Sequence, residues 1–312
     1  MGSGGSGTSY GTSDADSDVL RDRVRRELER QEFIADVNEY LGELLAQFND
    51  RDVETIARRL DELIERLGEA IEGVDRLLFG GSIAKHTFVD GLSDVDALVL
   101  MRGEQPDDPS DLVEAFAKTL RDALHGSDVS SVEAGRLAVT VVYRDGTEIQ
   151  LLPAVEKEGK VSIPSEDGRA WRDVRPRKFA EKLTAVNQAN GGGVVPVTKL
   201  AKALLAQLPD SQKLSGYHIE AIAVDAFESY QGLGSRQAML RHLLDHASRA
   251  ALSPTGDITG QTIHIDDHLG PARSSTRMSI SASIRRIVRR MDYARSVADY
   301  AELFDDVDEG GR

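Results

Sequence analysis

Two aspartates separated by a single residue, Asp94 and Asp96, are the feature of this sequence that most readily suggests chemistry. They stand at the start of the apolar run 97–101, and in an extended strand residues two apart point to the same face. Neighbouring carboxylates repel each other unless a cation lies between them, and Mg²⁺ takes carboxylate oxygens as ligands. Alone, the pair is more typical of a solvated loop before a buried strand, so its meaning depends on the surrounding residues.

A glycine–serine pair precedes the aspartates by about a dozen residues. Gly81 and Ser82 follow the short apolar run 77–79 and lead into a predicted short helix. Glycine lets the backbone approach a phosphate closely, and a helix N-terminus offers free N–H donors. Most such pairs are simple turns, but the combination with the two aspartates favours a site for a phosphorylated ligand and a metal ion.

A third carboxylate usually completes a metal site for phosphoryl transfer, and the segment 147–154 offers one. Glu148 and Gln150 share one strand face, whereas Ile149 and Leu151 point to the other face and into the core. Glu148 is an acid, while Gln150 is a neutral oxygen donor that cannot act as a general base.

The elements that must position these residues can be predicted from apolar spacing. Steps of three and four over 20–48 and 53–71 predict long amphipathic helices after a polar, disordered segment 1–17. Short apolar runs between 74 and 152 predict strands, with a helix over 110–124 among them and a loop-rich stretch up to 175. The fold class is therefore α+β, a small mixed sheet with a C-terminal helical lobe. The lobe's helices are expected at 177–190, 195–208, 216–231, 234–250 and 278–303.

Composition excludes several classes of function. The 38 Lys and Arg residues against 53 Asp and Glu residues give a net charge of −15, which argues against broad binding to duplex nucleic acid. Cysteine is absent, so disulfides, thiol catalysis and Cys-ligated zinc are excluded. No apolar run approaches the roughly 20 residues that span a bilayer, and we expect a cytoplasmic protein that does not engage a membrane.

Taken together, these segments resemble the polymerase-β-like nucleotidyltransferases. Within that superfamily they are similar to the cGAS/DncV-like enzymes, or CD-NTases, of CBASS antiphage defence, over roughly residues 35–303. The resemblance implies a nucleotidyltransferase catalytic domain with N-terminal helices over 18–175, a helical nucleotide-binding lobe over 176–303 and an acidic tail over 304–312. The motifs that carry it are Gly81-Ser82, Ser93–Asp96, Glu148–Ala154, Lys199–Lys202, Leu214–Glu220, Pro254–Asp257 and Asp266–Gly270.

The resemblance also implies roles for single residues. Two Mg²⁺ ions, for which Mn²⁺ could substitute, would be held by three catalytic acids, Asp94, Asp96 and Glu148. Many relatives carry Asp where this chain has Gln150, and Glu148 is expected to replace it. The nucleotide-binding residues would be Gly81, Ser82, Gln150, Lys199, Lys202, Ser215 and Tyr217, although the two lysines could equally be solvated and Tyr217 could be an ordinary core aromatic.

The implied function is synthesis of a cyclic di- or trinucleotide, or a short oligonucleotide, from NTPs as a second messenger for a downstream effector. Alternatives are a template-independent polymerase of linear RNA or DNA, an inactive nucleotide-binding pseudo-enzyme, and a protein-nucleotidylating transferase, which is typically shorter. The basic helical patch Arg285–Arg290 could be a salt-bridged face, or it could receive a regulatory protein or nucleic acid. The histidines at 242 and 246 and the His/Asp loop 264–268 are expected to be structural.

Overall fold

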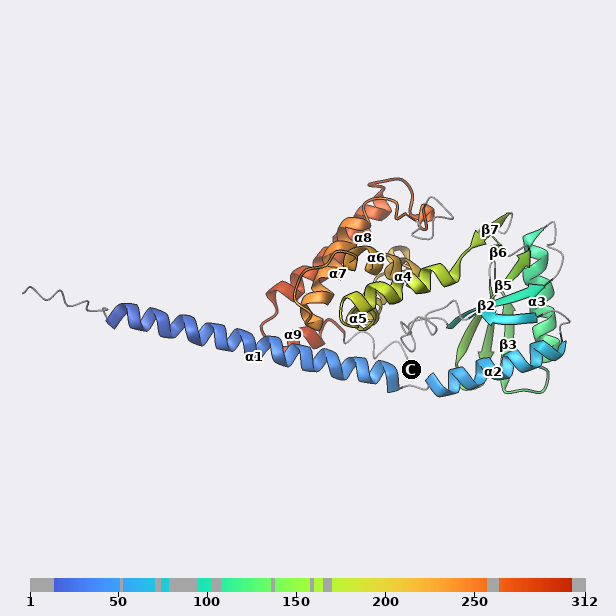
Figure 1. The fold of residues 1–312 in the computed structure, drawn as a ribbon, viewed down its shortest axis with the longest axis horizontal. Coiled ribbons are helices and arrows are strands. Elements are labelled where there is room, and N and C mark those ends of the chain that lie inside the picture. The colour runs from blue at the N-terminus through green and yellow to red at the C-terminus, as the bar shows by residue number, and fades with distance from the viewer. Residues whose placement is uncertain are drawn as a thin grey trace, which may run out of the picture.

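The computed structural model describes residues 14–50, 53–70, 74–78, 95–102, 108–135, 138–157, 160–164, 170–256 and 264–304. A mixed sheet lies at one end of the molecule, a group of helices lies beside it, and the first helix runs along the helical group and projects beyond it on the side away from the sheet (Figure 1). The α+β class is confirmed. None of the described helices combines the length and the apolar character that crossing a bilayer requires.

Within the described residues the sheet has seven strands in the order β1-β2-β5-β4-β3, and β6 and β7 extend it from β5. β2 and β5 are parallel, and the other neighbours are antiparallel. The parallel pair at the centre therefore places the starts of two strands, both rich in polar residues, side by side. The strands are β1 (Val74–Leu78), β2 (Val95–Arg102), β3 (Val129–Ala134), β4 (Val139–Tyr143), β5 (Glu148–Lys157), β6 (Lys160–Pro164) and β7 (Trp171–Val174).

Two helices, α2 (Val53–Ala70) and α3 (Pro109–Ala123), cover one face of the sheet. Their buried leucines and Phe116 pack on strand residues that include Ile149 and Leu151, both 0% exposed. The alternation predicted for β5 is confirmed, because Glu148 is exposed and Gln150 is only partly buried. The opposite face of the sheet carries a smaller apolar cluster of Leu98, Leu100 and Ala154.

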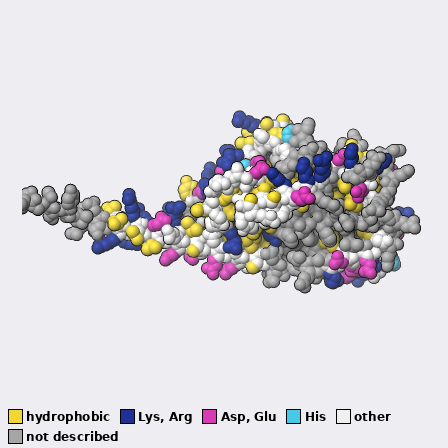
Figure 2. All heavy atoms as spheres, in the orientation of Figure 1, with side chains coloured by type: hydrophobic (Ala, Val, Ile, Leu, Met, Phe, Trp, Pro, Cys, Tyr) yellow, Lys and Arg dark blue, Asp and Glu magenta, His cyan; other side chains and the backbone are white. Residues whose placement is uncertain are grey.

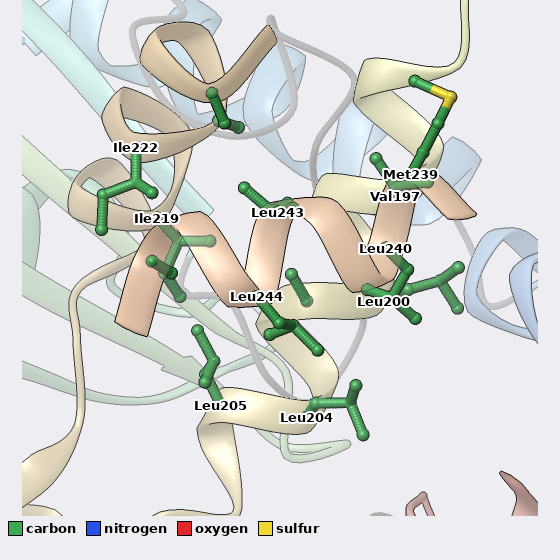
Figure 3. Close-up of a cluster of buried hydrophobic side chains, with 14 of the residues drawn as sticks. Val197, Leu200, Leu204, Leu205, Ile219, Ile222, Met239, Leu240, Leu243 and Leu244 are labelled. Atoms are coloured by element: carbon green, nitrogen blue, oxygen red, sulfur yellow. The ribbon is translucent and has the colours of Figure 1, made fainter. Parts of the chain in front are cut away.

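The helical lobe has its own core, formed largely by α5, α6 and α7 (Figure 3). Leucines at steps of three and four place one apolar stripe of each helix against its neighbours. Figure 3 shows Leu200 and Leu204 of α5, Ile219 of α6 and Leu243 of α7 in this cluster. The helices are α4 (Pro176–Ala189), α5 (Val194–Ala206), α6 (Gly216–Phe227), α7 (Arg236–Ala250), α8 (Ser275–Tyr293) and α9 (Val297–Ala301), with 3₁₀ turns at Asp210–Gln212 and Asp267–Leu269.

The first helix, α1 (Asp14–Asp50), packs with the helical lobe. Val37, Leu41, Leu45 and Phe48 are buried in the core of that lobe, against α5, α7 and α9. The sequence analysis grouped this helix with the catalytic domain, because spacing along one helix does not reveal which neighbour its apolar stripe meets.

Three local features differ from the sequence expectations. α1 begins at Asp14, inside the segment 1–17 that was expected to be disordered. The stretch expected to be loop-rich contains the end of β5 and all of β6 and β7. The helix expected over 278–303 is two helices, because Ser296 forms a capping box with Asp299 and starts α9 afresh.

Candidate functional site

The register between β2 and β5 brings two of the predicted site residues together. Asp96 and Gln150 are direct partners across the parallel pair, and Thr140 of β4 flanks Gln150 on its other side. Glu148 lies two residues earlier on β5 and is exposed. Positions 96, 148 and 150 therefore gather where the two strands begin, while Asp94, Gly81 and Ser82 lie outside the described residues.

The turn that leads into Glu148 is held by α2. Arg59, which is 5% exposed, donates hydrogen bonds to both carboxylate oxygens of Asp145, and its guanidinium lies 4.1 Å from the ring centroid of Tyr143. The hydrogen bond from Arg59, with another from the backbone N–H of Thr147, holds the pKa of Asp145 well below its usual range. Glu148 thus follows a turn that is anchored to the core.

The residue types predicted for the site suit a hard cation. Asp96, Glu148 and Gln150, and Asp94 two residues before Asp96 in the sequence, all carry oxygen donors, which Mg²⁺ prefers. In the part of the chain that the structure describes, no group of three or more acids and histidines is arranged to hold a metal ion. The register places positions 96, 148 and 150 at one edge of the sheet, and a metal site there stays a prediction.

The histidines expected to be structural have structural partners. His242 Nε2 lies 2.9 Å from the carbonyl oxygen of Ala226, and His246 Nε2 lies 2.7 Å from a carboxylate oxygen of Asp225. These contacts join α7 to α6.

Lys202 is buried rather than solvated. It is 4% exposed and donates a 2.8 Å hydrogen bond to Glu220, which is 1% exposed. Sequence reasoning missed the role of Glu220, although an acid between the apolar residues Ile219 and Ala221 of α6 was a signal for it. Lys199, one turn earlier, is partly buried, and burial together with the charge of Lys202 lowers its pKa. An anionic ligand beside Lys199 would be favoured, because it would offset this loss of hydration.

The start of α6 carries two more of the predicted residues, Ser215 and Tyr217, on either side of Gly216, which lies next to that ion pair. Ser215 caps the helix by accepting a 3.2 Å hydrogen bond from the His218 N–H. A Cβ atom on Gly216 would lie 3.3 Å from Lys202 Nζ, so glycine permits this close approach. Tyr217 is 36% exposed, and its ring centroid lies 4.6 Å from that of Phe179 on α4. Tyr217 therefore packs on Phe179 and is partly open to solvent, which suits a stacking platform.

A buried polar network ties the loop after α7 to this helix start. Asp266 and Arg277 are both 0% exposed and form a 2.8 Å ion pair. Arg277 also donates hydrogen bonds to the carbonyl oxygens of Ser253, Gly270 and Asp266. Its guanidinium group therefore connects both ends of the loop. Although burial raises the pKa of Asp266, hydrogen bonds from Arg277 and from a backbone N–H outweigh this effect and lower it.

His218 joins the network from α6. Its Nε2 atom lies 3.0 Å from Thr255 Oγ1 and 3.3 Å from Asp266 Oδ2. Burial lowers the pKa of His218 to about 4, against a smaller upward effect of Asp266. His218 is therefore neutral at neutral pH. It also follows Tyr217 directly in the sequence, so the network lies next to that aromatic residue. The sequence analysis expected a structural loop over 264–268 but did not identify its buried partners.

The basic patch on α8 is only partly salt-bridged. Arg290 lies 4.0 Å from Glu302. Arg285, Arg286 and Arg289 are exposed, and no acid in the described ranges lies within ion-pair distance of them. This helix face keeps an excess of positive charge in an acidic protein.

Comparison with protein families identifies a domain in the first part of the chain. Residues 35–187 match the model of the Second Messenger Oligonucleotide or Dinucleotide Synthetase domain, SMODS. No curated protein matches the chain.

Solved structures with the same fold share little sequence with the chain. E. coli MS115-1 CdnC, solved with ATP, is 17% identical with a TM-score of 0.62, covering 90% of this chain and 96% of CdnC. CdnC has also been solved in a complex with HORMA-deltaN. The Bradyrhizobium diazoefficiens CD-NTase CdnG, in complex with GTP, is 15% identical with a TM-score of 0.66, covering 88% of this chain and 98% of CdnG. The Vibrio cholerae cyclic AMP-GMP synthase DncV, in complex with nonhydrolyzable GTP, is 15% identical with a TM-score of 0.57, covering 93% of this chain and 90% of DncV.

Proposed function

Because the chain is a cGAS/DncV-like nucleotidyltransferase, a CD-NTase with a SMODS domain over residues 35–187, we propose that it makes a second messenger from NTPs. The product is a cyclic di- or trinucleotide or another short oligonucleotide. The observation that carries the proposal is the SMODS match, over the same segment whose β2–β5 register brings positions 96, 148 and 150 together. DncV, of the same fold, is a cyclic AMP-GMP synthase.

Each step of the reaction forms one phosphodiester, so a cyclic dinucleotide requires two such steps and a cyclic trinucleotide requires three. A ribose hydroxyl attacks the α-phosphate in line, a new O–P bond forms, the bond to the β-phosphate breaks, and pyrophosphate leaves. Bound Mg²⁺ would stabilise the phosphate charge and acidify the attacking hydroxyl. Asp94, Asp96 and Glu148 would hold the metal, and Glu148 would accept the hydroxyl proton.

The assignment of Glu148 as the third carboxylate is supported by its exposure. It lies at the first position of β5, after the turn anchored by Arg59, where its side chain is open to solvent. Gln150 is partly buried between β2 and β4 and carries no charge. We expect Glu148→Gln to lower turnover by orders of magnitude, Gln150→Ala to cost much less, and Gln150→Asp to retain or raise activity. A fully active Glu148→Gln enzyme would refute the assignment.

The nucleotide would lie between this strand edge and the start of α6. Gly81 and Ser82 would hold the β- and γ-phosphates, Lys199 would add positive charge, and Tyr217 would stack on a base. Lys202 would add positive charge near the nucleotide while staying paired with Glu220. Its ammonium group lies beside the backbone of Gly216. Calorimetry with a non-hydrolysable NTP tests this arrangement, since Tyr217→Ala should weaken binding by about 1–3 kcal/mol.

The decisive experiment is incubation with each labelled NTP and Mg²⁺ or Mn²⁺, followed by phosphatase treatment and mass spectrometry. A phosphatase-resistant product supports a cyclic messenger, whereas a ladder of linear products supports the polymerase alternative. Asp94→Ala with Asp96→Ala should abolish the product. Asp122→Ala, an exposed aspartate on α3, is the matched control and should leave the product unchanged. A wild-type protein that binds NTP and makes no product would support the pseudo-enzyme alternative.

We propose further that the messenger acts on an effector in antiphage defence within the cytoplasm. A regulatory protein or nucleic acid would bind the basic face of Arg285, Arg286 and Arg289, which lack acidic partners among the described residues. The fold is shared with CdnC, which forms a complex with HORMA-deltaN. Arg285→Glu with Arg289→Glu should remove stimulation by such a partner and leave basal synthesis unchanged.

A further inference from the structure

Arg59 of α2 is a buried cation whose partners lie on a single turn of the sheet. Figure 2 shows acidic and basic side chains at the surface of the end of the molecule that carries α2 and the sheet, whereas Arg59 is 5% exposed. Its guanidinium donates hydrogen bonds to both carboxylate oxygens of Asp145 and lies over the ring of Tyr143. A buried ion pair is often no more stabilising than apolar residues of similar volume, so stability alone does not explain an arginine at this position.

The two residues that this guanidinium contacts belong to the tight turn between β4 and β5. The N–H of Gly146 donates a 3.0 Å hydrogen bond to the carbonyl oxygen of Tyr143, and the N–H of Tyr143 donates one of 2.8 Å to the carbonyl oxygen of Thr147. Asp145 closes the turn, because one of its carboxylate oxygens accepts a 3.0 Å hydrogen bond from the Thr147 N–H. The same carboxylate therefore joins α2 to the residue that directly precedes Glu148.

Glu148 depends on this turn for its place at the edge of the sheet. It is the first residue of β5, and pairing with the parallel neighbour β2 begins one residue later, at Val95 and Ile149. On the other side, Glu148 pairs with Val142 of β4, directly before the turn. Strand ends that have few neighbours open easily. The turn therefore determines how firmly the backbone of Glu148 is held.

The side chain of Glu148 has little else to hold it in place. It is exposed, and no side chain in the described ranges makes a hydrogen bond or an ion pair with its carboxylate. A group that acts on reacting atoms must be held within about 0.5 Å of its productive geometry, and a displacement of about 1 Å can cost about a hundredfold in rate. The precision of this carboxylate must therefore come from the backbone on which it stands.

We propose that Arg59 is a positioning residue for Glu148, acting through Asp145 and the N–H of Thr147. The inference rests on the proposed function, in which Glu148 is the third carboxylate and accepts the hydroxyl proton. Arg59 does not act on the substrate itself, because α2 covers one face of the sheet and Glu148 points to the other. It holds the turn from a helix that lies 86 residues earlier in the chain.

The geometry of the guanidinium explains why an arginine suits this role. Its planar fork matches the two oxygens of Asp145, so it fixes the orientation of that carboxylate as well as its place. The contact with Tyr143 holds the opposite end of the same turn. A lysine would supply the charge without the fork, so we expect it to stabilise the turn and to orient it less well.

The first test measures kcat and KM by pyrophosphate release, below the melting temperature of every variant. Arg59→Met should lower kcat by about a hundredfold and leave the KM for NTP nearly unchanged, and Arg59→Lys should recover part of the loss. Arg59→Met with Asp145→Asn removes both charges, so it leaves no unpaired charge to unfold the protein, and it should show the same loss.

Arg66→Met is the matched control for this test. Arg66 is also on α2, but it pairs with Glu62 of the same helix at 3.2 Å and donates a 3.4 Å hydrogen bond to the carbonyl oxygen of Ala123. It therefore stabilises α2 without touching the turn. We expect Arg66→Met to keep the wild-type kcat even where it lowers the melting temperature.

The second test measures Mn²⁺ binding by the nucleotide-free protein, with electron paramagnetic resonance, and does not depend on turnover. Glu148→Gln should weaken binding, and Arg59→Met should weaken it by about tenfold, as is usual when a residue that orients a ligand is removed. Added to Glu148→Gln, Arg59→Met should have no further effect, because the carboxylate that it positions is already gone. A purely structural role would make the two effects add.

Three results would each overturn the positioning role: wild-type kcat in the folded Arg59→Met or double variant, an equal loss of kcat in Arg66→Met, or additive losses of Mn²⁺ affinity. Failure of the proposed function gives a different result. A fully active Glu148→Gln enzyme would refute the third-carboxylate assignment and this proposal with it. An impaired Glu148→Gln beside an unimpaired Arg59→Met would refute the positioning role alone.

Discussion

His218 should make the stability of this protein fall as the pH drops below neutrality. Its ring is 2% exposed and is held between Thr255 and Asp266. Burial lowers the pKa of His218 from the usual 6.5 to about 4. Above pH 6.5 the ring is neutral in both the folded and the unfolded chain, so it causes no dependence on pH there.

Between pH 6.5 and 4 the unfolded chain binds a proton at His218 that the folded chain does not. The unfolded state then binds more protons, so the free energy of unfolding decreases as the pH falls. One unit of pKa corresponds to about 1.4 kcal/mol, so the interval from 6.5 to about 4 amounts to a loss of about 3 kcal/mol. The loss is complete below about pH 4, where the folded ring is protonated too.

Urea unfolding followed by circular dichroism at a series of pH values from 7.5 to 4.5 measures this loss. His218→Gln should remove most of the slope, because glutamine keeps a polar group near Thr255 and does not titrate. His125→Gln is the matched control at an exposed histidine and should keep the slope. A wild-type stability that is flat from pH 6.5 to 4.5, or an unchanged slope in His218→Gln, would refute the reasoning.

Three further substitutions probe how the start of α6 and the late loop are held. Lys202→Met should cost about 3–5 kcal/mol of unfolding free energy, because it removes the ammonium from the buried Glu220 carboxylate; Lys202→Met with Glu220→Leu should recover most of it in the same urea assay. Ser215→Ala should cost about 1 kcal/mol through loss of the helix cap, and a value near zero would mean that the cap is not maintained in solution. Arg277→Lys should cost about 2 kcal/mol, because one ammonium cannot make all the hydrogen bonds of the guanidinium to Asp266 and the loop carbonyls; an unchanged melting temperature would contradict this.

Most elements of this fold were predictable because their signals are local. The helix starts predicted near 177, 195, 216 and 234 lie within two residues of the observed starts of α4, α5, α6 and α7. The alternation around Ile149 and Leu151 correctly separated the core side of β5 from its polar side. The helical spacing of apolar residues and the alternation of apolar and polar residues in a strand depend only on residues close in sequence. Both can therefore be recognised without knowledge of the tertiary contacts.

Elements whose boundaries depend on weaker signals were missed. The spacing of apolar residues continues past Tyr293, so a single helix was predicted where Ser296 and Asp299 start a new one. β6 and β7 are short, at the edge of the sheet, and Ser162 donates a 2.8 Å hydrogen bond to Asp173 between them. Strands this short are stable because they form hydrogen bonds with a neighbouring strand. The sequence of either strand alone does not show which segment that neighbour is.

The sequence by itself predicted the type of chemistry at the candidate site. The paired aspartates, the Gly81-Ser82 pair and the Glu148 segment indicate phosphate and metal chemistry, because only certain residue types at such spacings can provide it. The same residues carried the resemblance to the CD-NTases, which the comparison with family models confirmed.

Only the tertiary structure decided which charges are matched inside the protein and which strand positions are neighbours. It paired Lys202 with Glu220 and Asp266 with Arg277, and it set position 96 beside position 150 in the sheet. It also left residues 18–32 of α1 exposed, while the second half of the same helix is buried in the helical lobe. Burial and ion pairing join residues that are distant in the chain, so they follow from how helices and strands pack and not from spacing along any one of them.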